Sequence, residues 1–337
     1  MFDKNELEGR IMLDAAGLVA LADLRTIQNR TALTGSSGPL DVLFLAPGIH
    51  CQQDAEEVNG GERPETGMLC AGLGGGYHVF RVENQATVFW LQGIAEPGKL
   101  INVRVSDSAT ARADIYHNFM GSGIVPTFLC LLGCCGTITV IALLGAAHDF
   151  WGFIVLLMLV SARVINVVVI RRRAVVGWKG AVSTDKHETD LLILLSKDRW
   201  VRMRGVSDDV KAIISGCWLR DMIVLERYAT SFATVLVYAS SALAGNATTV
   251  GSLMIGSLIL VSAGLLGLAN SQTKNLHMFG RVASVVGKAK GYQRKRNMVD
   301  ELIKETGTSE WAYQLELIPR PTEAQKGMAY FIMRTNW

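Results

Sequence analysis

Two long stretches of the chain carry no Asp, Glu, Lys or Arg and consist mainly of apolar residues. The first lies between Asp114 and Asp149, and the second lies between Arg227 and Lys274. A helix needs about 20 residues to cross about 30 Å of hydrocarbon, so uncharged apolar runs of this length are typical of membrane spans. The pattern therefore predicts an integral membrane protein.

The apolar positions divide into four expected spans, which form two hairpins. His148 and Asp149 link the first two spans, and a turn at residues 245–248 links the last two. The second charge-free stretch is long enough for two crossings and the turn between them. We place the spans at about residues 123–147, 150–170, 228–244 and 250–270.

The Lys and Arg residues near the expected spans avoid both of these turns. Short cytosolic loops of membrane proteins are enriched in Lys and Arg, so the flanks that carry them are expected to face the cytosol. Two hairpins then place both termini in the cytosol, which fits the plasma membrane and the endoplasmic reticulum equally well. The flanking residues are Arg171, Arg172, Arg173, Lys179, Arg220, Arg227, Lys274 and Arg281.

The segments outside the hairpins are predicted to be cytosolic. Residues 1–120 combine helical and strand-like patterns, which predicts a small α+β domain. The hairpins occupy residues 121–171 and 227–272. Residues 172–226 are expected to form a linker with an amphipathic helix, and residues 273–337 a basic tail. The predicted fold class is a mainly α membrane protein, in which a four-helix transmembrane bundle of two hairpins carries the small N-terminal domain.

Local patterns predict individual elements in these cytosolic segments. In the N-terminal domain, Asn84 and Gln85 are expected to turn a hairpin between two strands. In the linker, a helix is expected to begin at Ser207, because acidic residues follow it and favour a helix N-terminus. In the tail, a basic helix is expected from Gly280 to about Gly307. Strand character recurs in the N-terminal stretches DVLFLAPGI, YHVFRVEN, ATVFWLQGI and LINVRVSDS.

Composition and charge exclude several classes of protein. Of 337 residues, 50% are hydrophobic and 19% are charged, below the roughly 25% charged residues of soluble domains. The net charge of +3 is too small to indicate nucleic-acid binding. The six cysteines do not form a paired C-x-x-C framework with His partners, so neither a zinc site nor a disulfide scaffold is predicted. No metal and no cofactor are expected. The opening residues, MFDKNELEGRIML, lack the apolar core of a signal peptide.

Arg163 is the candidate functional residue within the spans. It lies in the second span, eight residues before Arg171, which is about 12 Å of helix rise. Charged side chains inside a membrane are costly and often functional. One interpretation is that the guanidinium reaches the cytosolic headgroups or makes a structural pair. The other is that it binds a substrate or a lipid phosphate, and Asn166, one turn further on the same face, shares either role.

A basic run follows the last span. A cytosolic polybasic segment is attracted to anionic lipid headgroups by about 1 kcal/mol per charge near the surface. The ordinary cytosolic enrichment of Lys and Arg gives the same pattern, so both interpretations stay open. The run consists of Lys288, Lys290, Arg294, Lys295 and Arg296.

Small residues recur at four-residue spacing in the last span. Ser252 and Gly256 form one pair, and Ala263 and Gly267 form another. Small residues at this spacing allow close contact between helices, so they predict packing within the bundle and a possible homo-oligomer. The expected partners are therefore membrane lipids and a second copy of the chain.

The glycine-rich run at residues 72–76 does not form a dinucleotide-binding motif. Tyr77 stands where that motif needs its third glycine, and a strand-like segment follows where the motif needs a helix. We identify no catalytic motif in the sequence.

Three stretches of the chain resemble a group of multi-pass membrane proteins predicted in filamentous fungi. They are DRWVRMRGVSDDVKAIISGCWLRD, ATVLVYASSALAGNATTVGSLM and GYQRKRNMVDELIKETGTSEWA. The resemblance covers about residues 120–318 and leaves out the N-terminal domain. It implies a fungal membrane setting, and it transfers no catalytic residue.

Three functions fit these patterns. The first, which we favour, is a non-enzymatic scaffold, channel-like protein or transport-accessory protein. The alternative is a membrane-embedded enzyme that acts on an apolar lipid or isoprenoid in a biosynthetic pathway, with Arg163 and Asn166 at the substrate. A third is signalling through the N-terminal domain and the basic tail. A polar cavity around Arg163 would favour an enzyme or transporter, and a dry bundle would favour a scaffold.

Overall fold

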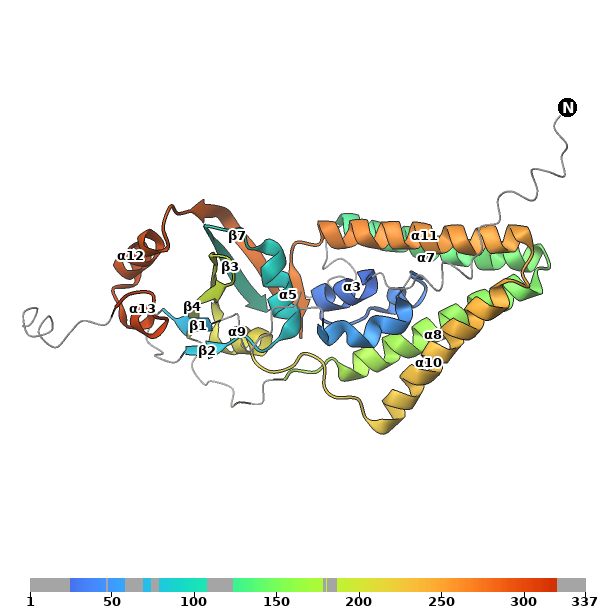
Figure 1. Cartoon of the computed structure of the whole chain (residues 1–337), viewed down its shortest axis with the longest axis horizontal. Helices are drawn as coiled ribbons and strands as arrows, with labels where there is room; N and C mark the ends of the chain where they lie inside the picture. The colour runs from blue at the N-terminus through green and yellow to red at the C-terminus, as the bar shows by residue number, and fades with distance from the viewer. Residues whose placement is uncertain are drawn as a thin grey trace, which may run out of the picture.

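The computed structural model is elongated, with a β-sheet at one end and four long helices at the other (Figure 1). Parts of the predicted terminal domains, residues 1–24 and 320–337, lie outside the described residues, as do Tyr77 and Lys179. All structural statements concern the described residues, which are 25–46, 48–57, 69–73, 79–107, 124–177, 180 and 187–319.

Four long helices follow the expected spans: α7 (Ile124–Ala146), α8 (Phe150–Arg173), α10 (Val224–Ala244) and α11 (Thr249–Gln272). Three of them, α7, α8 and α11, are long and apolar enough to cross a membrane. The fourth, α10, carries Glu226 and Arg227 in its first turn. The apolar pattern of the sequence thus located these helices to within a few residues.

The four helices pack as two pairs that diverge toward the sheet. α8 lies along α10, and α7 lies along α11, whereas helices that follow one another in the chain approach mainly near their connecting turns (Figure 1). The arrangement is a V with its point at the two turns. The two expected hairpins are therefore splayed, and the close packing joins one hairpin to the other rather than closing a compact four-helix bundle.

Asp149 joins the two turns at the point of the V. Its carboxylate accepts hydrogen bonds from the amide of Gly152 over 3.0 Å, and from the amide and hydroxyl of Thr248 over 3.0 and 2.6 Å. The first bond caps α8, and the others hold the turn before α11. Burial raises the pKa of Asp149, but these hydrogen bonds lower it by more, so the carboxylate is held in its charged form. A Cβ on Gly251 would lie 2.0 Å from Asp149 Oδ2, so this junction requires glycine there.

Residues 25–46 and 48–57, which we call the wedge segment, fill the space between the arms of the V (Figure 1). The segment comprises α3 (Thr26–Thr34) and two 3₁₀ helices, η1 (Pro39–Val42) and η2 (Ile49–Glu57). The described part of DVLFLAPGI is therefore not the expected strand, because it runs from the end of η1 through irregular backbone to the start of η2. The ring of Phe44 packs so closely on α7 that a Cβ on Gly133 would lie 2.1 Å from it.

A seven-stranded sheet forms the other end of the molecule. Its strand order is β2-β1-β4-β5-β3-β7-β6, in which β3 and β5 are parallel and all other neighbours are antiparallel. The strands are β1 (Leu69–Gly72), β2 (Val79–Arg81), β3 (Lys99–Asp107), β4 (Glu188–Leu195), β5 (Arg199–Val206), β6 (Leu276–Met278) and β7 (Arg281–Gly291). The regions expected to form an N-terminal domain, a linker and a tail all contribute strands to this one sheet.

Helices cover both faces of the sheet. On the face toward the long helices, α5 (Gln85–Ile94) and α9 (Ser207–Ile214) pack on apolar residues of β3, β4 and β5. On the other face, α12 (Lys295–Thr306) and α13 (Glu310–Gln314) pack on Leu192 and Trp200. Figure 1 shows this order of layers along the molecule.

Two expected elements are corrected by the structure. The stretch ATVFWLQGI is the helix α5, because the side chain of Asn84 accepts from the amides of Ala86 and Thr87 and caps it instead of turning a hairpin. The basic helix expected from Gly280 is the strand β7, which pairs with β3, and the helix α12 begins later at Lys295.

Two other expected boundaries are confirmed. The linker helix begins at Ser207, with Asp208 and Asp209 in its first turn. The tail helix ends at Gly307, whose φ of +71° is the left-handed geometry of a glycine C-cap. The hairpin of β4 and β5 that precedes Ser207 was not predicted.

Candidate functional site

A row of polar residues on α8 faces the wedge segment, and Arg163 is its first member along the chain. Arg163 is 2% exposed. Its Nε donates to the backbone oxygen of Asp41 over 2.7 Å, and its Nη1 donates to Oε1 of Gln52. The guanidinium therefore points into the protein and bonds to η1 and η2, which matches the structural-pair interpretation of this residue.

Asn166 is the second member of the row and is fully buried. Its Nδ2 donates to the backbone oxygen of Ile49 over 2.9 Å. Gln53 in turn donates to the backbone oxygen and Oδ1 of Asn166, over 3.0 and 3.2 Å. Asn166 and Arg163 thus both bind the wedge segment from the same helix.

Arg173, at the end of α8, completes the row. Its Nη1 donates to the backbone oxygen and Oε1 of Gln53, each over 3.1 Å, and its Nε donates to the backbone oxygen of Arg220 over 2.9 Å. Arg173 was expected among the charges that flank the membrane, whereas the structure buries it. It joins the wedge segment to the chain that leads into α10.

The wedge segment supplies the partners through two adjacent buried glutamines. Gln52 binds Arg163 and donates to the hydroxyls of Thr31 and Ser37. Gln53 binds both Asn166 and Arg173. Neither glutamine was predicted to be buried, because a polar stretch such as HCQQDAEE is typical of an exposed loop. The signal that could have indicated burial is the pair of apolar residues before and after the two glutamines, Ile49 and Ala55.

This polar network explains how irregular backbone is accommodated between the long helices. Backbone groups inside a membrane must be paired, and non-helical segments are tolerated there where protein surrounds them. The row from Arg163 to Arg173 extends about 15 Å along α8. A polar network whose members are bonded to each other fixes one docking geometry. The arrangement therefore holds the wedge segment in register on α8, with the Arg163 side chain directed toward η1 and η2.

A second charged network lies on the far face of the sheet. Arg202 of β5 donates to Asp190 of β4 over 2.6 Å and to Glu305 of α12 over 2.7 Å. Arg204 binds the same two carboxylates, each over 3.0 Å. Hydrogen bonds from Arg202 and then Arg204 hold the pKa of Glu305 below its ordinary value. This network joins α12 to the centre of the sheet.

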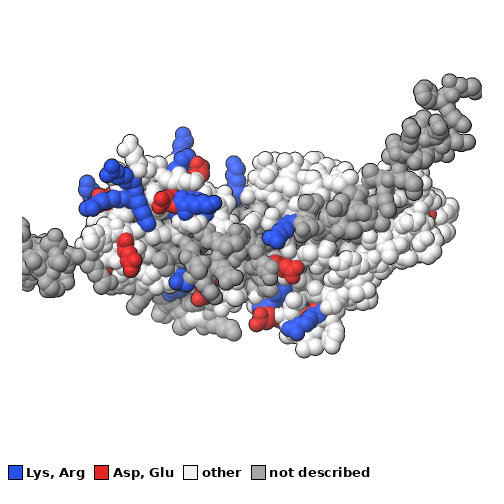
Figure 2. All heavy atoms as spheres, viewed as in Figure 1, with Lys and Arg blue, Asp and Glu red and all other residues white. Residues whose placement is uncertain are grey.

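The basic run lies on the sheet rather than on the long helices. Lys288 and Lys290 belong to β7, and Arg294, Lys295 and Arg296 lie at the start of α12. Figure 2 shows Lys and Arg gathered over this end of the molecule, away from the nearly uncharged surface of the long helices. Contact between this run and lipid headgroups stays a prediction.

The small residues of α11 differ in burial. Gly256 is buried, while Ser252, Ala263 and Gly267 are half-buried. The buried face of α11 packs on α7 within the molecule. The use of these residues in a homo-oligomer also stays a prediction.

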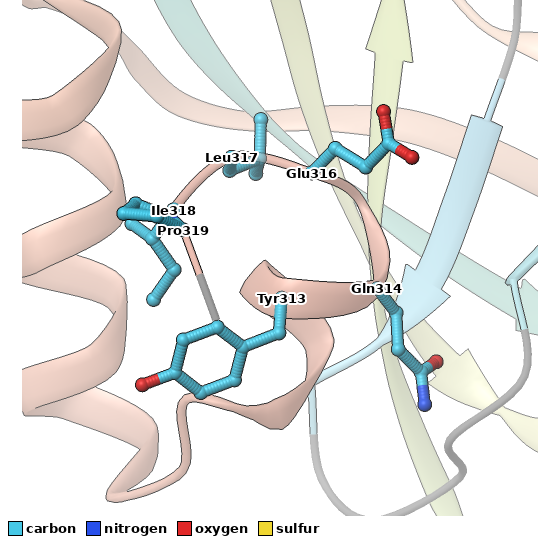
Figure 3. Close-up of a pocket in the computed structure, with 6 residues that line it drawn as sticks. All are labelled: Tyr313, Gln314, Glu316, Leu317, Ile318 and Pro319. Atoms are coloured by element: carbon cyan, nitrogen blue, oxygen red, sulfur yellow. The ribbon is translucent and has the colours of Figure 1, made fainter. Parts of the chain in front are cut away.

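A cavity of about 510 Å³ lies beside α13 at the end of the described chain. In Figure 3 the polar ends of Gln314 and Glu316 point away from its centre, so no set of polar groups converges there. Its lining residues are Tyr313, Gln314, Glu316, Leu317, Ile318 and Pro319.

The part of the chain that the structure describes holds no cluster of three or more His, Cys, Asp or Glu side chains with the geometry of a metal site. Comparison with family models, with curated proteins and with solved structures found no match to this chain.

Proposed function

We propose that this protein is a non-enzymatic membrane scaffold, in which four spans hold the mixed sheet at the cytosolic face of a membrane. The observation that carries the proposal is the use of the polar row on α8. Arg163, Asn166 and Arg173 all direct hydrogen bonds to the wedge segment. A membrane enzyme or carrier built on Arg163 needs a guanidinium that a substrate can reach.

The composition of the sheet supports four crossings. Its strands come from segments before α7, between α8 and α10, and after α11. Strands of one sheet lie on one side of a membrane, so an even number of crossings must separate them. If α11 crosses, α10 must cross as well, although it is less apolar than the other three.

Contacts at the start of α10 support the same proposal. Glu226 is buried and is paired with Arg220 and, over 3.4 Å, with Arg172. Neutralising this carboxylate where the helix begins reduces the cost of placing it near the membrane. The outer face of α10 exposes apolar side chains along its length, among them Val224, Leu225, Tyr228, Phe232, Val235 and Tyr238.

Single-cysteine labelling tests this topology. In a variant without its six native cysteines, cysteine is introduced at Asn246, between α10 and α11, or at Lys197, between β4 and β5. We expect a membrane-impermeant maleimide, applied from the non-cytosolic side, to label Asn246→Cys. Lys197→Cys and a matched Lys288→Cys variant should react after the membrane is permeabilised. The basic flanks of the spans set this orientation.

Two outcomes would contradict the proposal. Labelling of Lys197→Cys and Lys288→Cys from opposite sides would exclude a single cytosolic sheet. Turnover of an added lipid or isoprenoid by the purified protein, lost in an Arg163→Lys variant that stays folded, would replace the scaffold with an enzyme.

A further inference from the structure

The strand β7 is much longer than the strand beside it. β6 pairs with Arg281–Ala283, and no other strand among the described residues lies against the same edge of β7. The rest of β7, Ser284–Gly291, therefore has a sheet neighbour on one side, where it pairs with β3. We call these residues the open edge. Val285 and Val286 on it are 40% and 48% exposed.

The turn between β6 and β7 indicates which backbone groups face outward. Phe279 and Gly280 form a two-residue turn with φ of +51° and +71°, the geometry of a type I′ hairpin. In such a hairpin the flanking pair, Met278 and Arg281, exchanges hydrogen bonds, and hydrogen-bonded pairs then alternate along the strands. Counting by two from Arg281, the amide and carbonyl of Val285 face outward, beyond the end of β6.

The open edge overlaps the start of the basic run, at Lys288 and Lys290. Glu301 binds Lys290, and Asp300 lies 3.9 Å from Arg296. Lys288, Arg294 and Lys295 are exposed, and the described residues provide no acidic partner for them. Figure 2 shows the resulting gathering of positive charge at this end of the molecule.

We propose that the open edge of β7 binds an extended, acidic segment of a partner protein, which adds a strand to the sheet. Exposed strand edges are templates for strand addition, in which backbone hydrogen bonds provide affinity and side chains provide specificity. The outward amide and carbonyl of Val285 provide the backbone hydrogen bonds. The side chains of the basic run provide the specificity for an acidic segment. The inference deepens the proposed scaffold function and rests on it, because it names the kind of partner that the sheet presents.

Two other occupants fit the charges less well. A second copy of the chain would bring two basic edges together, and like charges across a strand pair are destabilising. A bilayer offers anionic charge but no extended backbone to pair with Val285, and the basic run lies away from the apolar helices in Figure 2. An acidic peptide satisfies both the backbone and the charge.

The bulge in β7 limits the length of the added strand. The register with β3 shifts between Leu100 and Asn102, opposite Gly287, whose φ is +76°. Bulges interrupt strand pairing and blunt an exposed edge. We therefore expect a short paired region around Val285, followed by ionic contacts with the basic run, and hence binding that weakens as salt is raised.

The test uses the full chain in nanodiscs of zwitterionic lipid. The probe is a fluorescent peptide of about ten residues in which Glu and Val alternate, and its binding is followed by fluorescence anisotropy. We expect saturable binding, and at least about tenfold weaker binding to Val285→Pro, which removes an outward N–H without removing a bond to β3. The matched Val285→Thr variant keeps that N–H and should bind as the parent protein does. The double variant Lys288→Glu/Lys295→Glu should also bind about tenfold more weakly.

Each alternative occupant gives a result that overturns the proposal. Equal binding of a Lys–Val peptide would exclude charge recognition, and unchanged binding to Val285→Pro would exclude the edge. Self-association that Val285→Pro abolishes would assign the edge to a second copy. Absence of peptide binding, together with vesicle binding that needs phosphatidylserine and Lys288, would assign the basic run to lipid.

If Val285→Pro unfolds, the charge-reversal variant decides the outcome. Cysteine labelling that confirms the topology in the same protein separates failure of this site from failure of the scaffold.

Discussion

At the scale of single residues, Arg163 shows how a charge is accommodated in an apolar helix. An Arg at the centre of a membrane helix costs about 2.5–3.5 kcal/mol on insertion scales. Here the side chain turns away from the lipid face, and the Asp41 carbonyl and Gln52 replace its water. The same bonds fix η1 and η2 to α8. Arg163 is therefore costly to insert into a membrane, and it also provides a specific contact between α8 and the wedge segment.

We expect Arg163→Leu to lower the thermal stability and the abundance of the protein. The substitution leaves the Asp41 carbonyl and Gln52 Oε1 buried without their donor, and each such group costs about 1–3 kcal/mol. The double variant Arg163→Leu/Gln52→Leu should lose less stability than the sum of the two single losses, because the two residues share one interaction. Thermal unfolding in detergent and abundance in membranes measure both effects.

The matched control for Arg163→Leu is Val168→Leu, on the exposed face of the same helix, which should change neither quantity. A structural role for Arg163 is contradicted if Arg163→Leu retains normal abundance and thermal stability while cellular function is lost.

The sequence indicates one half of this network and hides the other. Arg163 and Asn166 stand out because polar residues are conspicuous in an apolar run. Gln52 and Gln53 do not, because their partners lie more than about a hundred positions away and no local period encodes such a contact. Arg173 was assigned to the cytosolic flank. Its burial depends on what packs against the end of the helix, and no local pattern in the sequence shows this.

At the scale of elements, α12 is held on the sheet by apolar contacts and by one charged network. Met298, Val299 and Leu302 provide the buried apolar face. Glu305, one turn further on, binds Arg202 and Arg204. The carboxylate is half exposed, so its contribution is screened by solvent and is smaller than that of a fully buried pair.

We expect this network to make the stability of the sheet depend on pH. The pKa of Glu305 is lower in the folded protein than its ordinary value of 4.5. A lowered carboxyl pKa stabilises the folded state above the ordinary value, and the stabilisation is lost as the pH falls through the folded value. The parent protein should therefore unfold at a higher temperature than Glu305→Gln near neutral pH, and the difference should shrink as the pH falls below 4.5 and through the folded pKa of Glu305.

Thermal unfolding of both proteins across this pH range measures the effect, with Glu310→Gln as a control that lies outside the network. A difference between the parent and Glu305→Gln that stays constant with pH would show that the carboxylate acts through packing and not through charge.

Helices and strands were predictable to different degrees. The long helices follow from hydropathy, because about twenty apolar residues fit few other structures. α5 was mistaken for a strand, since a short apolar run has no clear period and the cap by Asn84 decides its structure. β7 was mistaken for a helix, since its Val residues alternate weakly and its pairing with β3 is remote in the sequence.

At the scale of the whole molecule, one sheet unites segments that the membrane helices separate in sequence. β3 has β5 on one side and β7 on the other, and these neighbours follow it by about one and two hundred residues. Parallel and remote pairings leave no local pattern, which explains why three separate cytosolic parts were expected instead. The long helices and the sheet are thus mutually dependent, because each successive pair of long helices returns the chain to the sheet.

This dependence makes a prediction about the N-terminal region. We expect residues 1–115, expressed alone, not to fold as a domain. β3 buries Ile101, Val103 and Val105 against residues of β4, β5 and α9, which the fragment lacks. In the fragment, β3 would also lose the hydrogen bonds along both of its edges, and unpaired strand edges favour aggregation. Circular dichroism and limited proteolysis should show neither cooperative unfolding nor a protected core, whereas the same strands in the full chain should resist proteolysis. A fragment that unfolds cooperatively would restore an independent N-terminal domain, and the sheet would then be an assembly of separately folded parts.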